Sequence, residues 1–457
     1  MSPADTLAAM ESVITDLFYW VSIALMLAIH AGFLAYEVGA SRSKNVLASA
    51  MKNLLTFAVV IATFFFFGWW CYYAFPQFPV GAIDLAGAAP FLPWGPEMGP
   101  NIESVNGIFW GAFALFAATT GSIMSGAVLE RIRTSAHLIL AVVLGSVVWI
   151  IGAAWAWHGN GWLLTEWGWH DFGAAGCVHL IAGAFTLGVL INLGPRIGRF
   201  VDGKAVTIRP HNLPLSMLGL MLIFVGFFGF LMGCVVYTNT GYITIFGNPT
   251  NLSAIAFNTL MGLAGGIIGA YMASKGEPFW TISGGLAGVI AVAPGMDLYH
   301  PALAFVVAVV GGVLIPYLGK LLEKFGIDDV VGAVTVHGGA GFYGLAVSGF
   351  LLWGYPNITT EDGPLPEINP LGQIGGAVVL ALLGFLTGYL ISLAMKKAKM
   401  LRIPPEAEIA GLDLSEVPAT PFPEGTPVTT VLEAVPAAGG VLVGATSASE
   451  EAEEVKA

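Results

Sequence analysis

Charged residues are scarce in this chain. Asp, Glu, Lys and Arg make up 10% of its 457 residues, while hydrophobic residues make up 56%. An ordinary soluble domain carries about 25% charged residues. No basic cluster or nucleic-acid-binding motif is present, which excludes a protein that holds a polyanion by charge. The composition therefore indicates a multi-pass protein of the cell membrane and no nucleic-acid partner.

Cysteine is almost absent, and metal-binding spacings are missing. Cys71, Cys177 and Cys234 all fall within apolar runs, so they predict no disulfide framework. No HxxxH or cysteine-rich ligand spacing supports a metal site made of His158, His170, Asp171 and His179. We therefore expect no metal, no cofactor and no catalytic residues, and a membrane enzyme is the least favoured interpretation.

Long apolar runs fill the chain up to residue 395. About 20 apolar residues cross the roughly 30 Å hydrocarbon core of a bilayer. Such runs cover residues 17–37, 54–75, 107–128, 136–154, 172–193, 215–236, 252–273, 279–293, 302–318, 330–353 and 374–395. The eighth run is short. The pattern predicts an all-α membrane protein with eleven transmembrane helices.

The basic residues orient these runs. Apart from Lys456, every Lys and Arg lies in a connection after an odd-numbered run or directly after the last run. Because basic loops stay in the cytoplasm, the N-terminus is predicted outside and the C-terminus inside. This divides the chain into an extracellular segment 1–16, a transmembrane domain 17–395 and a cytoplasmic tail 396–457. Residues 401–425 keep enough apolar side chains to dock on the domain, whereas the composition beyond about 426 predicts disorder.

Two histidines occur in a repeated frame inside apolar runs. His179 follows Asp171 by eight residues, His337 follows Asp329 by eight, and a glycine, Gly183 or Gly341, stands four residues after each histidine. Ionisable side chains within a membrane are costly and usually functional. The first frame enters from outside and the second from inside, and eight residues span about 12 Å of helix. Both imidazoles should therefore meet near mid-membrane, in an inverted repeat of halves 17–193 and 215–353 followed by a final helix 374–395.

The two aspartates have a structural interpretation that we favour over direct ion binding. A carboxylate at the start of a helix caps free N–H groups and opposes the positive end of the helix dipole. Asp171 and Asp329 occupy this position at opposite faces. Asp171 also lies near an outer vestibule, so it remains a candidate for both roles.

Aromatic residues form stripes on two of the expected helices. Phe109, Phe113 and Phe116 share one helical face, as do Phe227, Phe230 and Cys234. For any single phenylalanine, helix packing is the simpler explanation. Five tryptophans lie between 155 and 169; such residues usually form an interfacial belt, although an indole face can also hold a cation.

Six motifs together resemble the ammonium transporter, methylammonium permease and Rh family over about residues 15–422. They are RSKN at 42–45, FAATT followed by GAVLERIR at 116–133, DFGAAGCVH at 171–179, HNLP followed by GFFGF at 211–230, VHGGAG at 336–341 and GLDLSE at 411–416. The resemblance implies an ammonium transporter that forms homotrimers with one pore per subunit. It also implies methylammonium as a second substrate and a PII-type signal protein as a partner of the tail.

The resemblance also assigns roles to individual residues. His179 and His337 would be the twin pore histidines, Phe116 and Phe230 a stacked gate, Trp157 the outer cation-binding indole and Asp171 a buried acid beside it. Two departures concern the outer site. Cys234 stands where a hydroxyl usually helps to hold ammonium, and a thiol is a weaker acceptor. Ala112 aligns with a second outer aromatic, which leaves Phe109 or Phe113 as the substitute.

Three functions are compatible with the sequence. The favoured one is a transporter that binds ammonium outside, removes a proton and conducts ammonia, with or without a relayed proton, past the histidines. An Rh-like neutral gas channel is the second, and Trp157 argues against it. The third is an ammonium sensor that signals through its tail, although no kinase or cyclase domain is attached.

Overall fold

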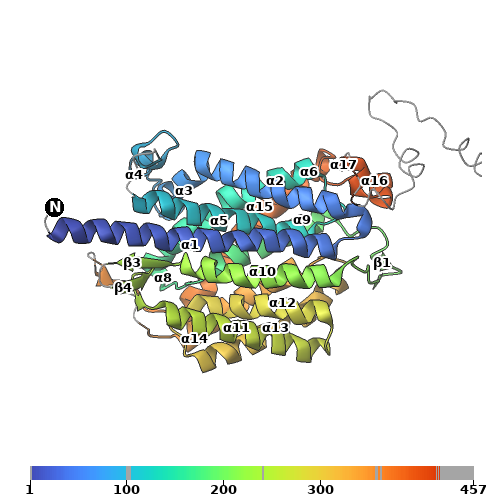
Figure 1. Ribbon diagram of the computed structural model, residues 1–457. Helices are drawn as coiled ribbons and strands as arrows, with labels where there is room; N and C mark the ends of the chain where they lie inside the picture. Colours follow the sequence, from blue (N-terminus) through green and yellow to red (C-terminus); the bar gives the residue numbers. More distant parts are fainter. Residues whose placement is uncertain are drawn as a thin grey trace, which may run out of the picture.

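The protein is a bundle of long helices. The computed structural model describes residues 3–98, 104–238, 241–355, 359–360, 363–417, 419 and 421. Within these residues, nine helices are long and apolar enough to cross a membrane. The helices lie side by side along a common direction (Figure 1). The structure is therefore that of a helical membrane protein.

The first half of the chain contributes helices up to residue 193. The long ones are α1 (Pro3–Ala40), α2 (Val46–Thr63) continued by η2 (Phe64–Gly68) and α3 (Trp69–Ala74), α5 (Ser104–Ala127), α6 (Thr134–Val143) continued by η5 (Leu144–Val148) and α7 (Trp149–Trp157), and η6 (Ala175–Leu180) continued by α9 (Ile181–Leu193). Short helical turns connect them. These are η1 (Ser43–Asn45), α4 (Leu85–Ala88), η3 (Ala89–Phe91), η4 (Pro96–Met98) and α8 (Trp162–Trp167).

The second half of the chain also consists mainly of long helices. Its long helices are α10 (Leu213–Met232), α11 (Leu252–Ser274), α12 (Pro278–Val292) followed by η7 (Ala293–Gly295), α13 (Pro301–Lys324), η8 (Val334–Gly339) continued by α14 (Ala340–Leu351), and α15 (Pro370–Lys397). Short antiparallel strands occur only in connections among the described residues. They are β1 (Phe200–Val201) with β2 (Lys204–Ala205), β3 (Val235–Thr238) with β4 (Gly241–Thr244) and β5 (Pro249–Thr250), and β6 (Thr359–Thr360) with β7 (Gly363–Pro364).

The second helix begins well before the apolar run at 54–75 that predicted it. The additional turns carry polar residues that face other parts of the protein. Lys52 is buried and its Nζ donates to the carbonyl of Ile132, while Asn53 Nδ2 donates to Glu37. Hydropathy cannot detect such turns, because their polar groups are satisfied internally. The short eighth run is the helix α12, whose start is capped by Glu277 accepting from the N–H of Trp280.

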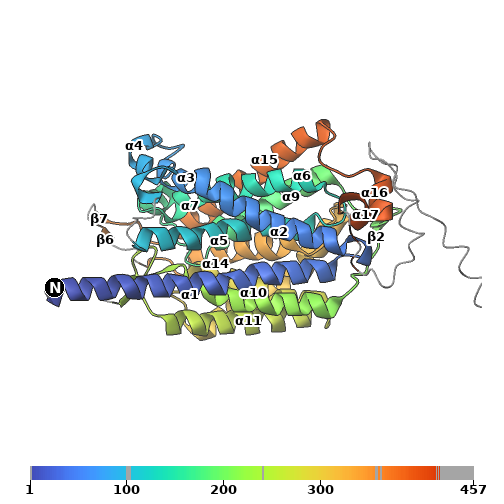
Figure 2. The ribbon, with the colours of Figure 1, turned by 45° about the horizontal axis from the view of Figure 1, so that its top comes forward.

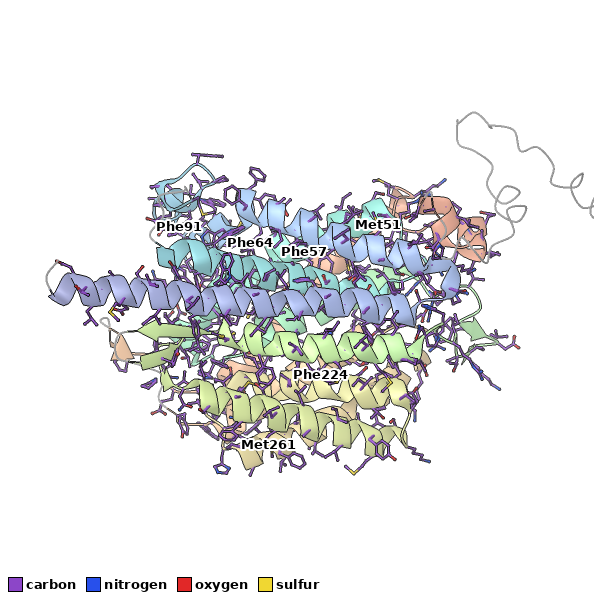
Figure 3. All side chains as sticks on the ribbon, viewed as in Figure 1. Met51, Phe57, Phe64, Phe91, Phe224 and Met261 are labelled. Carbon is purple, nitrogen blue, oxygen red and sulfur yellow. The ribbon has the colours of Figure 1, made fainter. Side chains whose placement is uncertain are left out.

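Large apolar side chains cover both the inside and the outside of the bundle. Phe224 reaches from α10 to Gly285 on α12 (Figure 3). Many others point outward, among them Phe66, Leu218, Met221, Phe257 and Leu382. A soluble protein rarely exposes so much contiguous apolar surface, whereas a surface of this kind suits contact with lipid tails.

The beginning of the tail is docked on the bundle. The helices α16 (Pro405–Ala410) and α17 (Leu412–Glu416) lie at the end opposite the N-terminus (Figure 2); we call this end the tail face. Asp413 accepts from the N–H of Ala48 at 2.8 Å, and Asn45 accepts from the N–H of Leu412 at 2.9 Å. The expected docking is therefore present as far as the structure describes it. The disorder predicted beyond 426 lies outside the described residues.

Candidate functional site

The two histidines of the repeated frame meet inside the bundle. Nδ1 of His179 and Nδ1 of His337 are 3.0 Å apart, and their ring centroids are 5.1 Å apart. Their exposed fractions are 2% and 6%. Both lie in π-helical turns, η6 and η8, and such wide turns are rare and frequent at functional sites. The two imidazoles therefore meet, as the spacing predicted.

The two aspartates cap the turns that carry these histidines. The carboxylate of Asp171 accepts from the N–H groups of Ala175 and Gly176 at 2.8 Å and of Cys177 at 3.2 Å. Asp329 accepts from the N–H groups of residues 333 and 334 at 2.9 and 2.8 Å. Both carboxylates thus satisfy helix-start donors, as the favoured structural interpretation predicted. Each fixes the entry of its histidine turn.

The glycines of the frame allow these two segments to touch. A Cβ at Gly183 would lie 2.3 Å from the backbone nitrogen of Gly338, and one at Gly341 would lie 2.7 Å from the carbonyl oxygen of Ala175. Backbones that approach this closely leave no room for a side chain. The contact between the imidazoles therefore depends on small residues beside them.

Gly183→Ala tests this close approach. Since the added methyl would meet backbone and not a flexible side chain, the segments must separate, and overpacking of this kind costs about 1–3 kcal/mol. We expect a lower thermal midpoint and weaker transport. Gly159→Ala is the matched control, because its Cβ would meet nothing within 4 Å. If the two variants have the same thermal midpoint and the same transport, the two segments can accommodate the added methyl without separating.

A pair of phenylalanines covers His179. The ring centroids of Phe116 and Phe230 are 4.3 Å apart with an interplanar angle of 76°, and both residues are fully buried. The stacked geometry implied by the resemblance is therefore wrong, because the rings meet edge to face. The ring that lies parallel to Phe230 is that of His179, with centroids 5.8 Å apart and an angle of 23°. Parallel packing on the imidazole turns Phe230 away from a stack with Phe116.

The residues proposed for the outer site gather beyond this pair. Trp157 is 3% exposed and packs edge-on against Phe116 and Phe113, at 5.7 and 6.0 Å. Its indole N–H donates to the backbone carbonyl of Asp171 at 2.8 Å, which fixes the ring. Cys234 lies directly after α10 and its thiol donates to the carbonyl of Phe230 at 3.5 Å. Phe113, one of the two expected substitutes for an aromatic residue at Ala112, therefore lies in contact with Trp157.

Within the described residues, no group of three or more His, Cys, Asp or Glu is arranged to hold a metal ion. The histidines and the aspartate considered above as metal ligands make other contacts. His158 packs against Tyr72 and Tyr73, while His170 Nε2 lies 3.1 Å from Asp297. The carboxylate of Asp171 is directed to its own helix.

A buried ion-pair network at the tail face was not foreseen. Asp328 accepts from the backbone and side chain of Arg196 and from Arg199, with Arg131 3.9 Å away. Burial alone would raise the pKa of Asp328, but Arg131 and Arg196 outweigh it and hold that pKa well below its ordinary value. Asp328 precedes the capping residue Asp329, so the network holds the start of the His337 segment. Its partners are remote in sequence, and no local pattern reveals them.

The contact between the two imidazoles determines which of their nitrogen atoms can donate a hydrogen bond and which can accept one. Two Nδ1 atoms at hydrogen-bond distance share one proton, so one ring donates and the other accepts. The remaining Nε2 atoms then differ, one carrying a proton and the other a lone pair. Such a pair can both donate a hydrogen bond to a small polar molecule and accept one from it.

Comparison with known proteins assigns this arrangement to a family. Residues 17–421 match the Ammonium Transporter Family. The chain belongs to the ammonium transporter family. It is 31% identical over 416 residues to ammonium transporter Amt1 of Methanocaldococcus jannaschii, covering 91% of this chain and 98% of the relative. Ammonium transport across the cell membrane by a multi-pass protein is the activity of this family.

Solved structures share the fold. A Sensor Amt Protein superposes with a TM-score of 0.75 at 28% identity, covering 90% of this chain and 99% of that one. Candida albicans Mep2 gives 0.69 at 21% identity, with 92% and 93% covered. The Rh50 protein of Nitrosomonas europaea gives 0.61 at 21%, with 85% and 89% covered. The last two likenesses concern the fold alone, and together the three establish the Amt/Mep/Rh fold.

Proposed function

We propose that this protein recruits NH4+ at an outer aromatic site, removes a proton and conducts ammonia past His179 and His337. The proton is either relayed along the imidazoles or left outside. The observation that carries this proposal is the 3.0 Å contact between the two Nδ1 atoms beneath the closed aromatic pair Phe116 and Phe230. This contact supplies groups that can give up or take up a proton at a point lined mostly by apolar side chains.

The energetics favour transfer of the neutral molecule. Removing an isolated cation from water costs tens of kcal/mol in the Born limit, and a cation–π contact returns only about 2 kcal/mol. Aromatic rings alone therefore cannot carry the charge. Potassium has a similar size and meets the same barrier, but it has no proton to release. Selectivity then rests on acid–base chemistry at the histidines.

The proposal includes an orientation and an assembly. We count eleven spans by adding α5 and the segment η8–α14 to the nine long helices, arranged as inverted halves with the N-terminus outside. The gathering of Arg42, Arg131 and Arg196 at the tail face, around Glu130 and Asp328, supports a cytoplasmic tail face. We further propose a homotrimer, methylammonium as a second substrate, and a PII-type signal protein as the partner at the tail face.

Trp157 and Cys234 provide a test of the outer site. A charge-assisted hydrogen bond is worth about 1.5–3 kcal/mol, and a hydroxyl accepts from ammonium better than a thiol does. Cys234→Ser should therefore lower the half-saturating ammonium concentration, by about tenfold for each 1.4 kcal/mol gained. Trp157→Leu should raise it. The maximum current should change less in both variants, because neither residue touches the histidine pair.

The measurement is the concentration dependence of ammonium-driven current in reconstituted membranes. Ala88→Ser is a control that adds a hydroxyl at a buried position in α4, outside the proposed site. If neither variant shifts the half-saturating concentration, ammonium is recruited elsewhere or recruitment does not limit transport.

A sensor is the second candidate function. The docked segment 401–417 contacts η1 and the first turns of α2 and α6, and a similar solved structure is named a Sensor Amt Protein. Current separates the candidates, because a protein that only senses ammonium carries none. A neutral gas channel moves ammonia without current, and the charge-holding indole of Trp157 disfavours it.

A further inference from the structure

A small cavity lies beside His337 on the side away from the aromatic pair. Its volume of about 10 Å³ is at the lower limit for holding one water-sized molecule. Val331 and Ala333, from the start of the His337 segment at the tail face, line it together with Glu37 and Ser283. The cavity therefore joins the inner imidazole to a carboxyl group of α1.

Glu37 is an unusual residue for this place. It is 1% exposed, and in the described part of the chain it forms no ion pair with Lys or Arg. Oε2 accepts from Asn53 Nδ2 at 2.8 Å, and Oε1 is hydrogen-bonded to the hydroxyl of Ser125. The buried Lys52 acts on Glu37 electrostatically but makes no ion pair with it among the described residues. A buried carboxylate without a basic group in contact is costly, so this carboxyl is suited to hold a proton.

The contacts of Ser125 accommodate both protonation states of Glu37. Ser125 Oγ lies 2.6 Å from the carbonyl of Ser122 as well as next to Glu37 Oε1, but a hydroxyl has one proton to donate. When Ser125 donates to Glu37, the carboxyl is ionised. When Ser125 donates to the carbonyl, Glu37 must itself donate to Ser125 Oγ and is protonated. When Glu37 gains or loses a proton, rotation of one hydroxyl thus keeps the hydrogen bond between the two side chains.

A second polar group faces the same cavity. Ser283 is fully buried, and its hydroxyl has no partner of good hydrogen-bond geometry among the described residues; the nearby Tyr36 hydroxyl donates instead to the carbonyl of Val331 at 3.2 Å. Buried polar atoms without partners are rare in native proteins. A small molecule in the cavity that both donates and accepts hydrogen bonds, such as ammonia or ammonium, would satisfy this hydroxyl.

We propose that Glu37, with Ser283, forms an inner ammonium site that returns the proton to ammonia; this rests on the proposed function and on its relayed-proton form. Ammonia leaving His337 takes the proton of the Glu37 carboxyl: an O–H bond breaks, an N–H bond forms, and ammonium and a carboxylate result. The proton released at the outer site, relayed from His179 to His337, then restores the acid. One ammonium ion is moved in each cycle.

The test separates proton movement from ammonia movement. Purified full-length protein is reconstituted into liposomes; ammonium-driven current is recorded, and ammonia entry is followed as the total ammonia plus ammonium that accumulates in the lumen. Glu37→Gln keeps the size and polarity of the side chain but cannot hand over a proton. We expect its current to fall by about tenfold or more, while ammonia entry remains close to the wild-type rate. Glu37→Asp, which keeps the acid, should retain part of the current.

Asn53→Ala is the matched control, because it removes a hydrogen bond to Glu37 and leaves the carboxyl in place. It should keep the current. Equal loss of current and ammonia entry in Glu37→Gln, or loss of current in Asn53→Ala to the same extent, would show that Glu37 only ties α1 to α2 and α5, and would overturn the inference. If Glu37→Gln does not fold, Ser283→Ala decides in its place: reduced current with preserved ammonia entry supports the inner site, and unchanged current overturns it.

Measurements on the wild-type protein distinguish failure of the inner site from failure of the proposed transport function. Wild-type current with an unaffected Glu37→Gln variant rejects the inner site and leaves the proposed function standing. Absence of both ammonium current and ammonia entry in the wild type rejects both.

Discussion

Replacing His179 or His337 with alanine will abolish selective ammonium transport. Each imidazole offers a donor or an acceptor among side chains that are mostly apolar, and each also fixes the proton position of the other across the 3.0 Å contact. A hydrogen bond of this kind is worth about 1–3 kcal/mol when its loss leaves a polar group unsatisfied. We therefore expect ammonium current to fall by about 10- to 100-fold, or potassium to enter once acid–base selection is lost.

The matched control is His300→Ala. His300 is exposed and caps the start of α13, away from the pair. It should retain wild-type current and selectivity. If both pore variants keep wild-type selectivity over potassium, the histidines are not where ammonium is distinguished from other cations.

Asp328→Ala will cause the largest loss of stability. The Asp328 side chain is 1% exposed and neutralises Arg196, which is 6% exposed, and the fully buried Arg131. Removing one partner of a buried pair leaves uncompensated charge and costs about 3–5 kcal/mol. Glu323→Ala is the control: it removes a partner of Arg199 whose side chain is 39% exposed, and exposed pairs contribute about 0–1 kcal/mol. Thermal unfolding in detergent measures both.

The same residue predicts a pH dependence. The pKa of Asp328 is lowered in the folded protein, against about 3.9 when unfolded. A lowered folded pKa stabilises the protein fully above the unfolded value, and this contribution is lost as the pH falls towards the folded value. The wild type should therefore lose stability below about pH 4, and Asp328→Ala should show a smaller decline. A stability difference between the two that does not change with pH would contradict this.

The positions of the helices and of the histidine pair were within reach of the sequence. Apolar runs predict helices because lipid allows no unpaired backbone groups, and the equal spacing from Asp171 to His179 and from Asp329 to His337 predicts that the imidazoles meet. The early start of α2 was missed because the polar face around Lys52 is satisfied inside the protein.

Ring orientation and remote pairing could not be predicted in this way. The edge-to-face contact of Phe116 and Phe230 depends on how His179 and Trp157 pack around them. Glu37 ends an apolar run, and its sequence position gives no sign of the cavity that it shares with His337. Asp328 and Arg131 are far apart in the chain, and only the fold brings them together.

The central claim is that ammonium is selected because it can release a proton at a dry pore. The most direct measurement is current through the purified wild-type protein in a reconstituted bilayer, under equal gradients of ammonium and of potassium. With the proton relayed along the imidazoles, we expect an ammonium-driven current and no potassium current, since potassium meets the full cost of dehydration. Comparable currents for the two ions would show that the charged ion itself crosses the pore, and would contradict the account.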